Sequence, residues 1–239
     1  MAKPKNFGTS DCVSVRRLYD NFLRNATTLI GRQGVTFDAQ NLAEKLSVEL
    51  NGTGKIIVKT RDNCGFWFFG LPRHKGNKSN VIKACLTLKQ DIVLGEKGCL
   101  VLLNSNVHVS YFEEVRHGKH KILESWHFDF APNQEGHPIF HAQLTEDHYP
   151  LPSPTYKYSP AHRKPDLKDL PRVPTPPLDL AAIMEMLVAD HLPEYAAIVD
   201  STDWRKAAEG LPQLPMAHFS SWKLSAIDKL KARHWYPKD

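Results

Sequence analysis

The sequence predicts an α+β protein in which N-terminal helices pack on an antiparallel sheet, followed by a proline-rich arm and a C-terminal helical segment. Three observations indicate this class. Apolar residues near the N-terminus recur at helical spacing, β-branched and aromatic residues then form short runs between turn residues, and prolines gather in one later stretch. The 239 residues are enough for a substantial core.

Two helices are expected to open the chain. The first follows the potential cap Ser14 and ends near Gly31, because apolar residues recur every three or four positions between them. The second is expected over residues 36–50, where Thr36 can cap it and the Asn-Gly pair beginning at Asn51 stops it.

Short β-branched and aromatic runs then predict an antiparallel sheet. The predicted strands are residues 55–60, 66–71, 99–103, 107–112, 122–130 and 139–144. Residues 81–94 fit either an alternating strand or a helix capped by Ser79 and closed by Gly95, and we favour the helix.

Nine of the 17 prolines lie between residues 150 and 177, where they favour extended backbone and exclude a helix interior. Asp179 is then expected to cap a helix, with shorter helical patterns further on. The predicted organisation is an α+β domain over 1–148, a linker or wrapping arm over 149–178, and a helical segment over 179–239.

Composition excludes several classes of protein. No run approaches the roughly 18 apolar residues of a membrane span, and no apolar stretch follows the N-terminal lysines, so we expect a cytoplasmic protein without membrane contact. The four cysteines form no CxxC pair and are expected in the core. The motifs GxxxxGK[ST], GxGxxG, HExxH and GxSxG are absent.

Positive charge is concentrated in the first half of the chain. Residues 1–120 contain 18 Lys and Arg against 10 Asp and Glu, and residues 55–89 contain eight against one. Because phosphates bind cations and bases stack on aromatic rings, this segment predicts nucleic-acid binding. The candidate binding residues are Lys59, Arg61, Trp67, Arg73, Lys75 and Lys78. The alternative is a solvated basic loop beside a strand whose aromatic residues belong to the core.

Histidines are strongly enriched late in the predicted sheet, where six of the twelve lie within residues 117–148. His127 and Asp129 share one face of a predicted strand, and His141 lies on the next, in a hairpin-like arrangement. If paired positions sum to an even number, for example with His127 opposite His141, all three side chains share a face. The sequence alone leaves this register open.

His127, Asp129 and His141 are the candidate catalytic residues, because imidazoles and a carboxylate can bind a divalent metal or act as an acid–base pair. With the basic segment, they suggest a nucleic-acid-associated protein that acts as a metal- or histidine-dependent nuclease. The competing hypothesis is a non-catalytic assembly subunit with structural histidines, which binds a protein partner through residues 149–239. A small-molecule enzyme is a third possibility.

Overall fold

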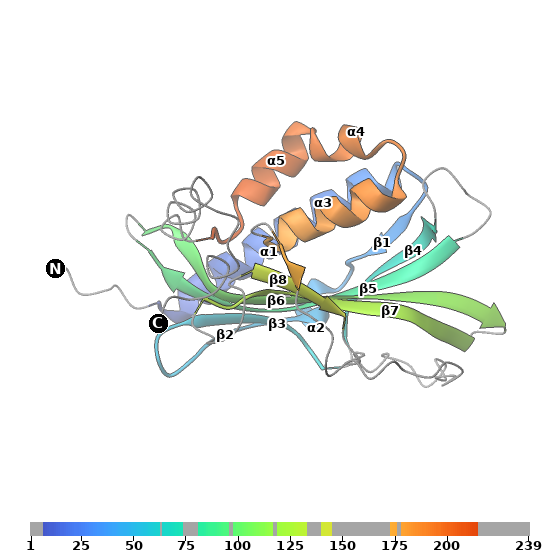
Figure 1. The fold of residues 1–239 in the computed structure, drawn as a ribbon. Helices are drawn as coiled ribbons and strands as arrows, with labels where there is room; N and C mark the ends of the chain where they lie inside the picture. The colour runs from blue at the N-terminus through green and yellow to red at the C-terminus, as the bar shows by residue number, and fades with distance from the viewer. Residues whose placement is uncertain are drawn as a thin grey trace, which may run out of the picture.

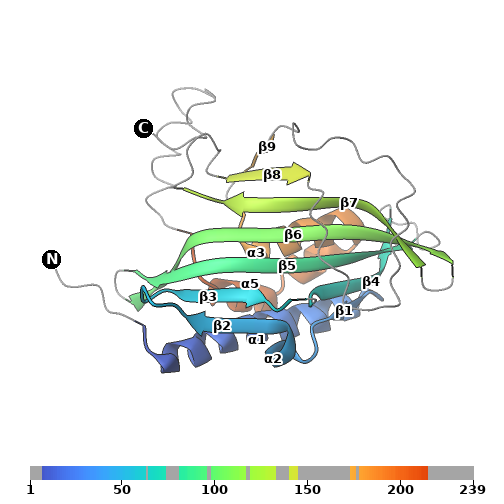
Figure 2. The same cartoon turned by 90° about the horizontal axis from the view of Figure 1, so that it is seen from below.

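The structure is a computed structural model that describes residues 7–62, 64–73, 81–95, 98–116, 119–132, 140–144, 173–175 and 178–214. These ranges form a large antiparallel sheet with helices over one of its faces (Figure 1). Seen from below, the sheet lies in front of helices α3 and α5 (Figure 2). The predicted α+β class is therefore confirmed at this level.

The described sheet has nine strands. They are β1 (Thr36–Asp38), β2 (Leu46–Leu50), β3 (Ile56–Thr60), β4 (Phe66–Pro72), β5 (Val81–Leu94), β6 (Leu100–Arg116), β7 (Lys119–Phe130), β8 (Phe140–Leu144) and β9 (Val173–Pro174). Their spatial order is β1-β4-β5-β6-β7-β8-β9, and β2 joins through β3. One edge of β5 is shared, because β4 pairs with its first half and β3 with its second. The two strands expected at 99–103 and 107–112 are parts of the single strand β6.

Five helices are described: α1 (Thr9–Gly31), α2 (Leu42–Lys45), α3 (Leu180–His191), α4 (Tyr195–Val199) and α5 (Thr202–Glu209). Helix α1 confirms the first expected helix and begins earlier, where the Gly8 backbone N–H donates to Asp11 Oδ2 at 2.6 Å. Most of its apolar stripe is buried, and Tyr19 and Phe22 are fully so. That burial is the main source of stability for an amphipathic helix.

The prediction of a second helix over residues 36–50 is wrong. This stretch forms β1, the four-residue helix α2 and β2. Asn41 has a positive φ of 52°, a left-handed conformation that a continuous helix cannot contain. The Asn51 side chain then accepts hydrogen bonds from the backbone of Thr53 and Lys55, closing the turn of a β2–β3 hairpin.

The helix favoured over residues 81–94 is also wrong, because this segment is the long central strand β5. The five consecutive residues 84–88 are all buried, which shows that both faces of the strand are covered. A strand covered on both faces has a continuous apolar run, which periodicity alone does not distinguish from a buried helix.

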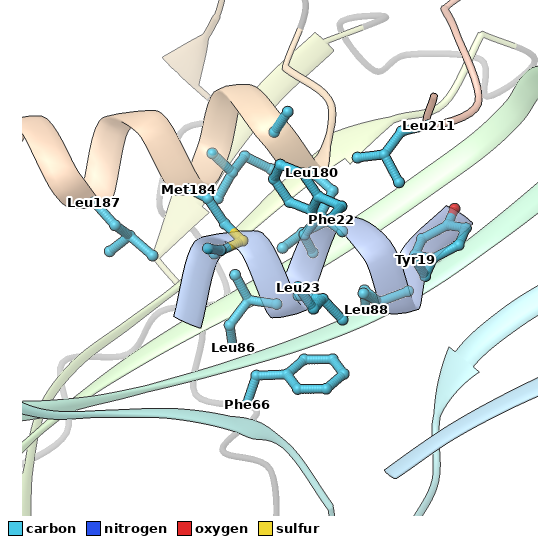
Figure 3. Packing of buried hydrophobic residues seen from close by; sticks show 14 of the residues in the cluster. Tyr19, Phe22, Leu23, Phe66, Leu86, Leu88, Leu180, Met184, Leu187 and Leu211 are labelled. Atoms are coloured by element: carbon cyan, nitrogen blue, oxygen red, sulfur yellow. The ribbon is translucent and has the colours of Figure 1, made fainter. Parts of the chain in front are cut away.

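The C-terminal helices complete the core. The Asp179 side chain caps α3, as predicted, by accepting from the Ala182 N–H at 2.9 Å. Side chains from α1, α3 and the sheet meet in one cluster, with Leu187 of α3 fully buried (Figure 3). The Phe22 and Trp204 rings are 5.2 Å apart and join α1 to α5. These helices therefore use their apolar faces within the chain.

Several predicted features lie outside the described residues. They include the last expected helix, which starts at Ser220 or Ser221, and most of the proline-rich arm, of which residues 173–175 and 178 are described. Crossing a bilayer takes a helix of about 20 mostly apolar residues. No helix in the described ranges meets that requirement.

Candidate metal centre

Strands β7 and β8 bring together the three predicted site residues. His127 and Asp129 alternate with core residues of β7, and His141 does so on β8, which places all three on the sheet face opposite the helices, here called the second face. The register pairs Asp129 with His141 and His127 with Gln143. The numbers of each pair sum to an even number, as a shared face requires. The pairing is shifted by two residues from the His127–His141 example given above. The shift makes Asp129 the neighbour of both imidazoles.

The three side chains have the spacing of metal ligands. Asp129 Oδ2 lies 3.2 Å from His141 Nε2 and 3.4 Å from His127 Nε2. The three candidate ligand atoms all lie within 4.8 Å of one another. Two ligands of a tetrahedral Zn²⁺, each about 2.0 to 2.1 Å from the ion, are about 3.3 Å apart. The cluster could therefore hold a divalent ion with small side-chain adjustments.

The surroundings of Asp129 keep its carboxyl group ionised. Burial opposes ionisation, but the His141 hydrogen bond, the nearby imidazoles and the Asn106 hydrogen bond outweigh it, so the pKa of Asp129 lies below its ordinary value. Asn106 lies directly opposite Asp129 on β6 and donates from Nδ2 to Oδ1. Because a metal-binding carboxyl group must be deprotonated, Asp129 is in the required state at neutral pH.

The cluster is accessible from one side only. His141 is 1% exposed, whereas His127 and Asp129 side chains are 17% and 18% exposed. A ligand from solvent would therefore reach His127 and Asp129, while His141 would close the inner side of the site.

Sequence reasoning missed His108. It lies on β6 directly opposite His127, and the two rings are 5.6 Å apart. The alternation of Asn104, Asn106 and His108 along β6 was the available signal, since it places polar residues on one face. The predicted strands at 99–103 and 107–112 leave Asn104 and Asn106 between them, whereas β6 is continuous through these residues.

The residues predicted to bind nucleic acid do not form one cluster. Lys59 lies on the second face, through its pairing with Lys89. Trp67 is 6% exposed and packs in a small apolar cluster with Cys85 and Phe112. Its ring therefore fills a packing position and does not offer an open surface on which a base could stack.

The remaining basic candidates are dispersed. Arg61 is exposed just after β3. Arg73 is 3.5 Å from Glu113, so part of its charge is neutralised within the chain. Lys75 and Lys78 lie outside the described residues.

A pocket of about 430 Å³ adjoins the candidate metal centre on the second face. It is lined by Lys89, Asp91, Asn104, Ser105, Asn106, Asp129, Phe130 and Ala131. Cross-strand pairing carries one row of residues through this region, from Lys59 and Lys89 through Asn106 to Asp129 and His141. The row joins two cationic side chains to the histidine and aspartate cluster.

Comparison with known proteins gives no match: no family model, no curated protein and no solved structure is similar to this chain. The chain is thus characterised by its own fold and site, an α+β protein with two histidines and one aspartate gathered on the second face of its sheet.

Proposed function

We propose that this protein is a cytoplasmic, metal-dependent nuclease in which His127, Asp129 and His141 hold a divalent ion. The observation that carries the proposal is the convergence of their ligand atoms within 4.8 Å on one sheet face. Three protein ligands leave coordination positions for water and substrate. Two imidazole nitrogens favour ions such as Zn²⁺ over Mg²⁺, which prefers oxygen ligands.

Each residue has a separate role in this proposal. His127 and His141 provide ring nitrogens, Asp129 provides a carboxylate oxygen, and Asn106 fixes the carboxylate through its hydrogen bond. An ion held by these residues would act as a Lewis acid and lower the pKa of a water to about 7. In the hydrolysis, the water oxygen would form a bond to phosphorus, the ester P–O bond would break, and the departing oxygen would receive the proton. One water is consumed for each bond cleaved.

The basic segment supports nucleic acid as the substrate. Residues 55–89 carry eight cationic side chains against one carboxylate, and a polyanion is the partner that such a segment favours. Lys59 and Lys89 of this segment lie on the same face as the candidate metal centre. The cations and the hydrolytic site are therefore close enough to act on one phosphate chain.

The competing function is a non-catalytic assembly subunit in which the cluster is structural. The burial of His141 favours this alternative, because buried histidines commonly serve as hydrogen-bonding groups of the fold. Leu187 of α3 is buried against the core, so α3 does not offer this apolar side chain to a partner. A protein partner remains a prediction for residues 149–239.

Metal titration by calorimetry, followed by measurement of metal content after gel filtration, tests the proposal. We expect one Zn²⁺ per chain. Loss of a residue that hydrogen-bonds a metal ligand weakens metal binding by roughly 10- to 100-fold, so loss of the ligand itself in Asp129→Asn should weaken it at least as much. Asp91→Asn is the matched control, since Asp91 lines the same pocket but is not in the cluster. Cleavage of labelled single- and double-stranded RNA and DNA is then measured with each ion.

Three outcomes discriminate between the hypotheses. Metal-dependent cleavage that is lost in Asp129→Asn and kept in Asp203→Asn, an exposed residue of α5 on the helix side of the sheet, supports the nuclease. Metal binding without cleavage of any nucleic acid contradicts the reaction while leaving the metal centre. A wild-type chain that binds none of the ions contradicts the proposal as a whole and supports a structural cluster.

A further inference from the structure

Two lysines face each other on the second face of the sheet. Lys59 on β3 pairs directly with Lys89 on β5, and like charges in such positions destabilise a sheet. In the described part of the chain, neither ammonium group has a carboxylate within 4.0 Å. Glu49, whose pKa is lowered by its Ser47 hydrogen bond and by Lys59, is exposed and offsets only part of this charge. A bound anion would relieve the repulsion.

The pocket extends from Lys89 to Asp129 of the candidate metal centre, and Lys59 lies beside Lys89 without lining it. Lys89 and Asp129 both line it, with Asn106 between them on the intervening strand. Adjacent strands are about 4.8 Å apart, so β5 and β7 are separated by roughly 10 Å. A phosphate between them can meet the lysine side chains on one side and an ion beside Asp129 on the other.

The neighbouring row of pocket residues, two positions along β5 from Lys89, has different chemistry. Asp91 and Asn104 are a cross-strand pair, and Asn104 Nδ2 donates to Asp91 Oδ2 at 3.2 Å. A carboxylate here repels phosphate but accepts hydrogen bonds from hydroxyl or amino groups. A sugar or base fits this row, while a phosphate fits the row of Lys89 and Asp129.

The size of the pocket limits what can enter. A volume of about 430 Å³ lies in the range of small-molecule sites, which is roughly 300 to 1,000 Å³. We propose that the pocket holds a single nucleotide unit, free or at the end of a strand, with its phosphate between the Lys59–Lys89 pair and the metal centre. This inference rests on the proposed function and adds its substrate class: the protein acts on nucleotide ends or free nucleotides, not on the interior of a duplex.

The test uses the full chain with saturating Zn²⁺ and AMP as the probe, titrated by calorimetry, with adenosine as the probe lacking phosphate. Lys89→Gln should weaken AMP binding by about tenfold or more, since it removes a charge-assisted contact. Lys59→Gln should weaken AMP binding by a smaller factor. Lys83→Gln is the matched control: it lies on the same strand and face, but it pairs with Glu114 at 3.0 Å and does not line the pocket.

A second arm distinguishes the two sources of the nucleotide. A linear single strand and its covalently closed circle are incubated with the enzyme, and AMP hydrolysis is followed in parallel. Shortening of the linear strand, or release of phosphate from AMP, supports the inference, whereas cleavage of the circle at the same rate overturns it.

The binding arm can fail separately from the proposed function. If Zn²⁺ binds but AMP does not, or if AMP binds equally to wild type and Lys89→Gln, the nucleotide pocket is wrong and the metal centre stands. If Zn²⁺ itself does not bind, the proposed function fails first, and the pocket inference fails with it.

Discussion

Two buried polar networks, one on each face of the sheet, differ in the kind of group they contain. On the helix face, Tyr19 Oη donates to Gln90 Oε1 at 2.5 Å, and Gln90 Nε2 donates to Ser105 Oγ at 2.8 Å. These groups are neutral, and burial together with nearby Asp179 raises the pKa of Tyr19, so it remains a donor. The second face instead gathers Asp129 and His141 with further histidines.

Under the proposed function, this difference separates a face that serves stability from a face that serves chemistry. Neutral groups that satisfy one another cost little to bury. Ionisable groups cost more unless they are paired or bind an ion, and clusters of them are enriched at functional sites. Substitutions on the helix face should therefore change mainly the free energy of unfolding, and those on the second face mainly ligand binding.

The largest expected effect is on the helix face. Phe22→Ala should lower the free energy of unfolding by about 3 to 5 kcal/mol, because the ring is fully buried against Trp204. Chemical denaturation measures this loss, and His127→Ala is the comparison from the second face. An equally large loss in His127→Ala would break the distinction between the faces.

Metal should stabilise the fold through the second face. Zn²⁺ at 100 times its Kd should raise the free energy of unfolding of the wild type by about 2.7 kcal/mol, since it binds the folded state. Thermal unfolding with and without Zn²⁺ measures this gain. Asp129→Asn should show no gain, whereas Asp91→Asn should keep it; equal gains in both variants would move the ion to another site.

A smaller loss is expected from the neutral network. Tyr19→Phe leaves Gln90 Oε1 without its donor, which should cost roughly 1 to 3 kcal/mol. The stabilisation by Zn²⁺ should be unchanged in this variant. Denaturation curves with and without the ion check both statements, and a loss of the Zn²⁺ effect would show that the faces are coupled.

The smallest effect is the acid dependence of Asp129. Its folded-state pKa is lowered, so its contribution to stability is complete above the unfolded value of about 3.9 and is lost as pH falls through the folded-state pKa. The free energies of unfolding of wild type and Asp129→Asn, measured without metal, should therefore converge between pH 4 and pH 2. A difference that stays constant across this range would contradict the role of the ionised carboxylate.

The sequence predicted helices and strands correctly where the hydrophobic pattern fitted only one kind of element. The apolar stripe of α1 and the alternating run of β7 are examples. It failed at 81–94, because a strand buried on both faces lacks alternation, and at 36–50, because the left-handed Asn41 interrupts an otherwise helical stripe. Both failures depend on tertiary neighbours that local pattern does not contain.

The candidate site was predictable in its residues but not in its arrangement. His127, Asp129 and His141 were identified from histidine enrichment and strand alternation. They share a face for any register in which the numbers of paired residues sum to an even number. Which residue lies opposite which depends on the connection between β7 and β8. His108 and Lys89 could be placed beside the candidate site only from the pairings of β5, β6 and β7. These pairings join residues far apart in the sequence.

Strand β9 has a consequence for how copies of this chain meet. Its Pro174 lies opposite His141, at the end of the described strand order. Proline has no amide hydrogen, so this margin of the sheet offers one fewer donor to an incoming strand. This edge of the sheet, next to His141, is therefore a poorer template for an added strand.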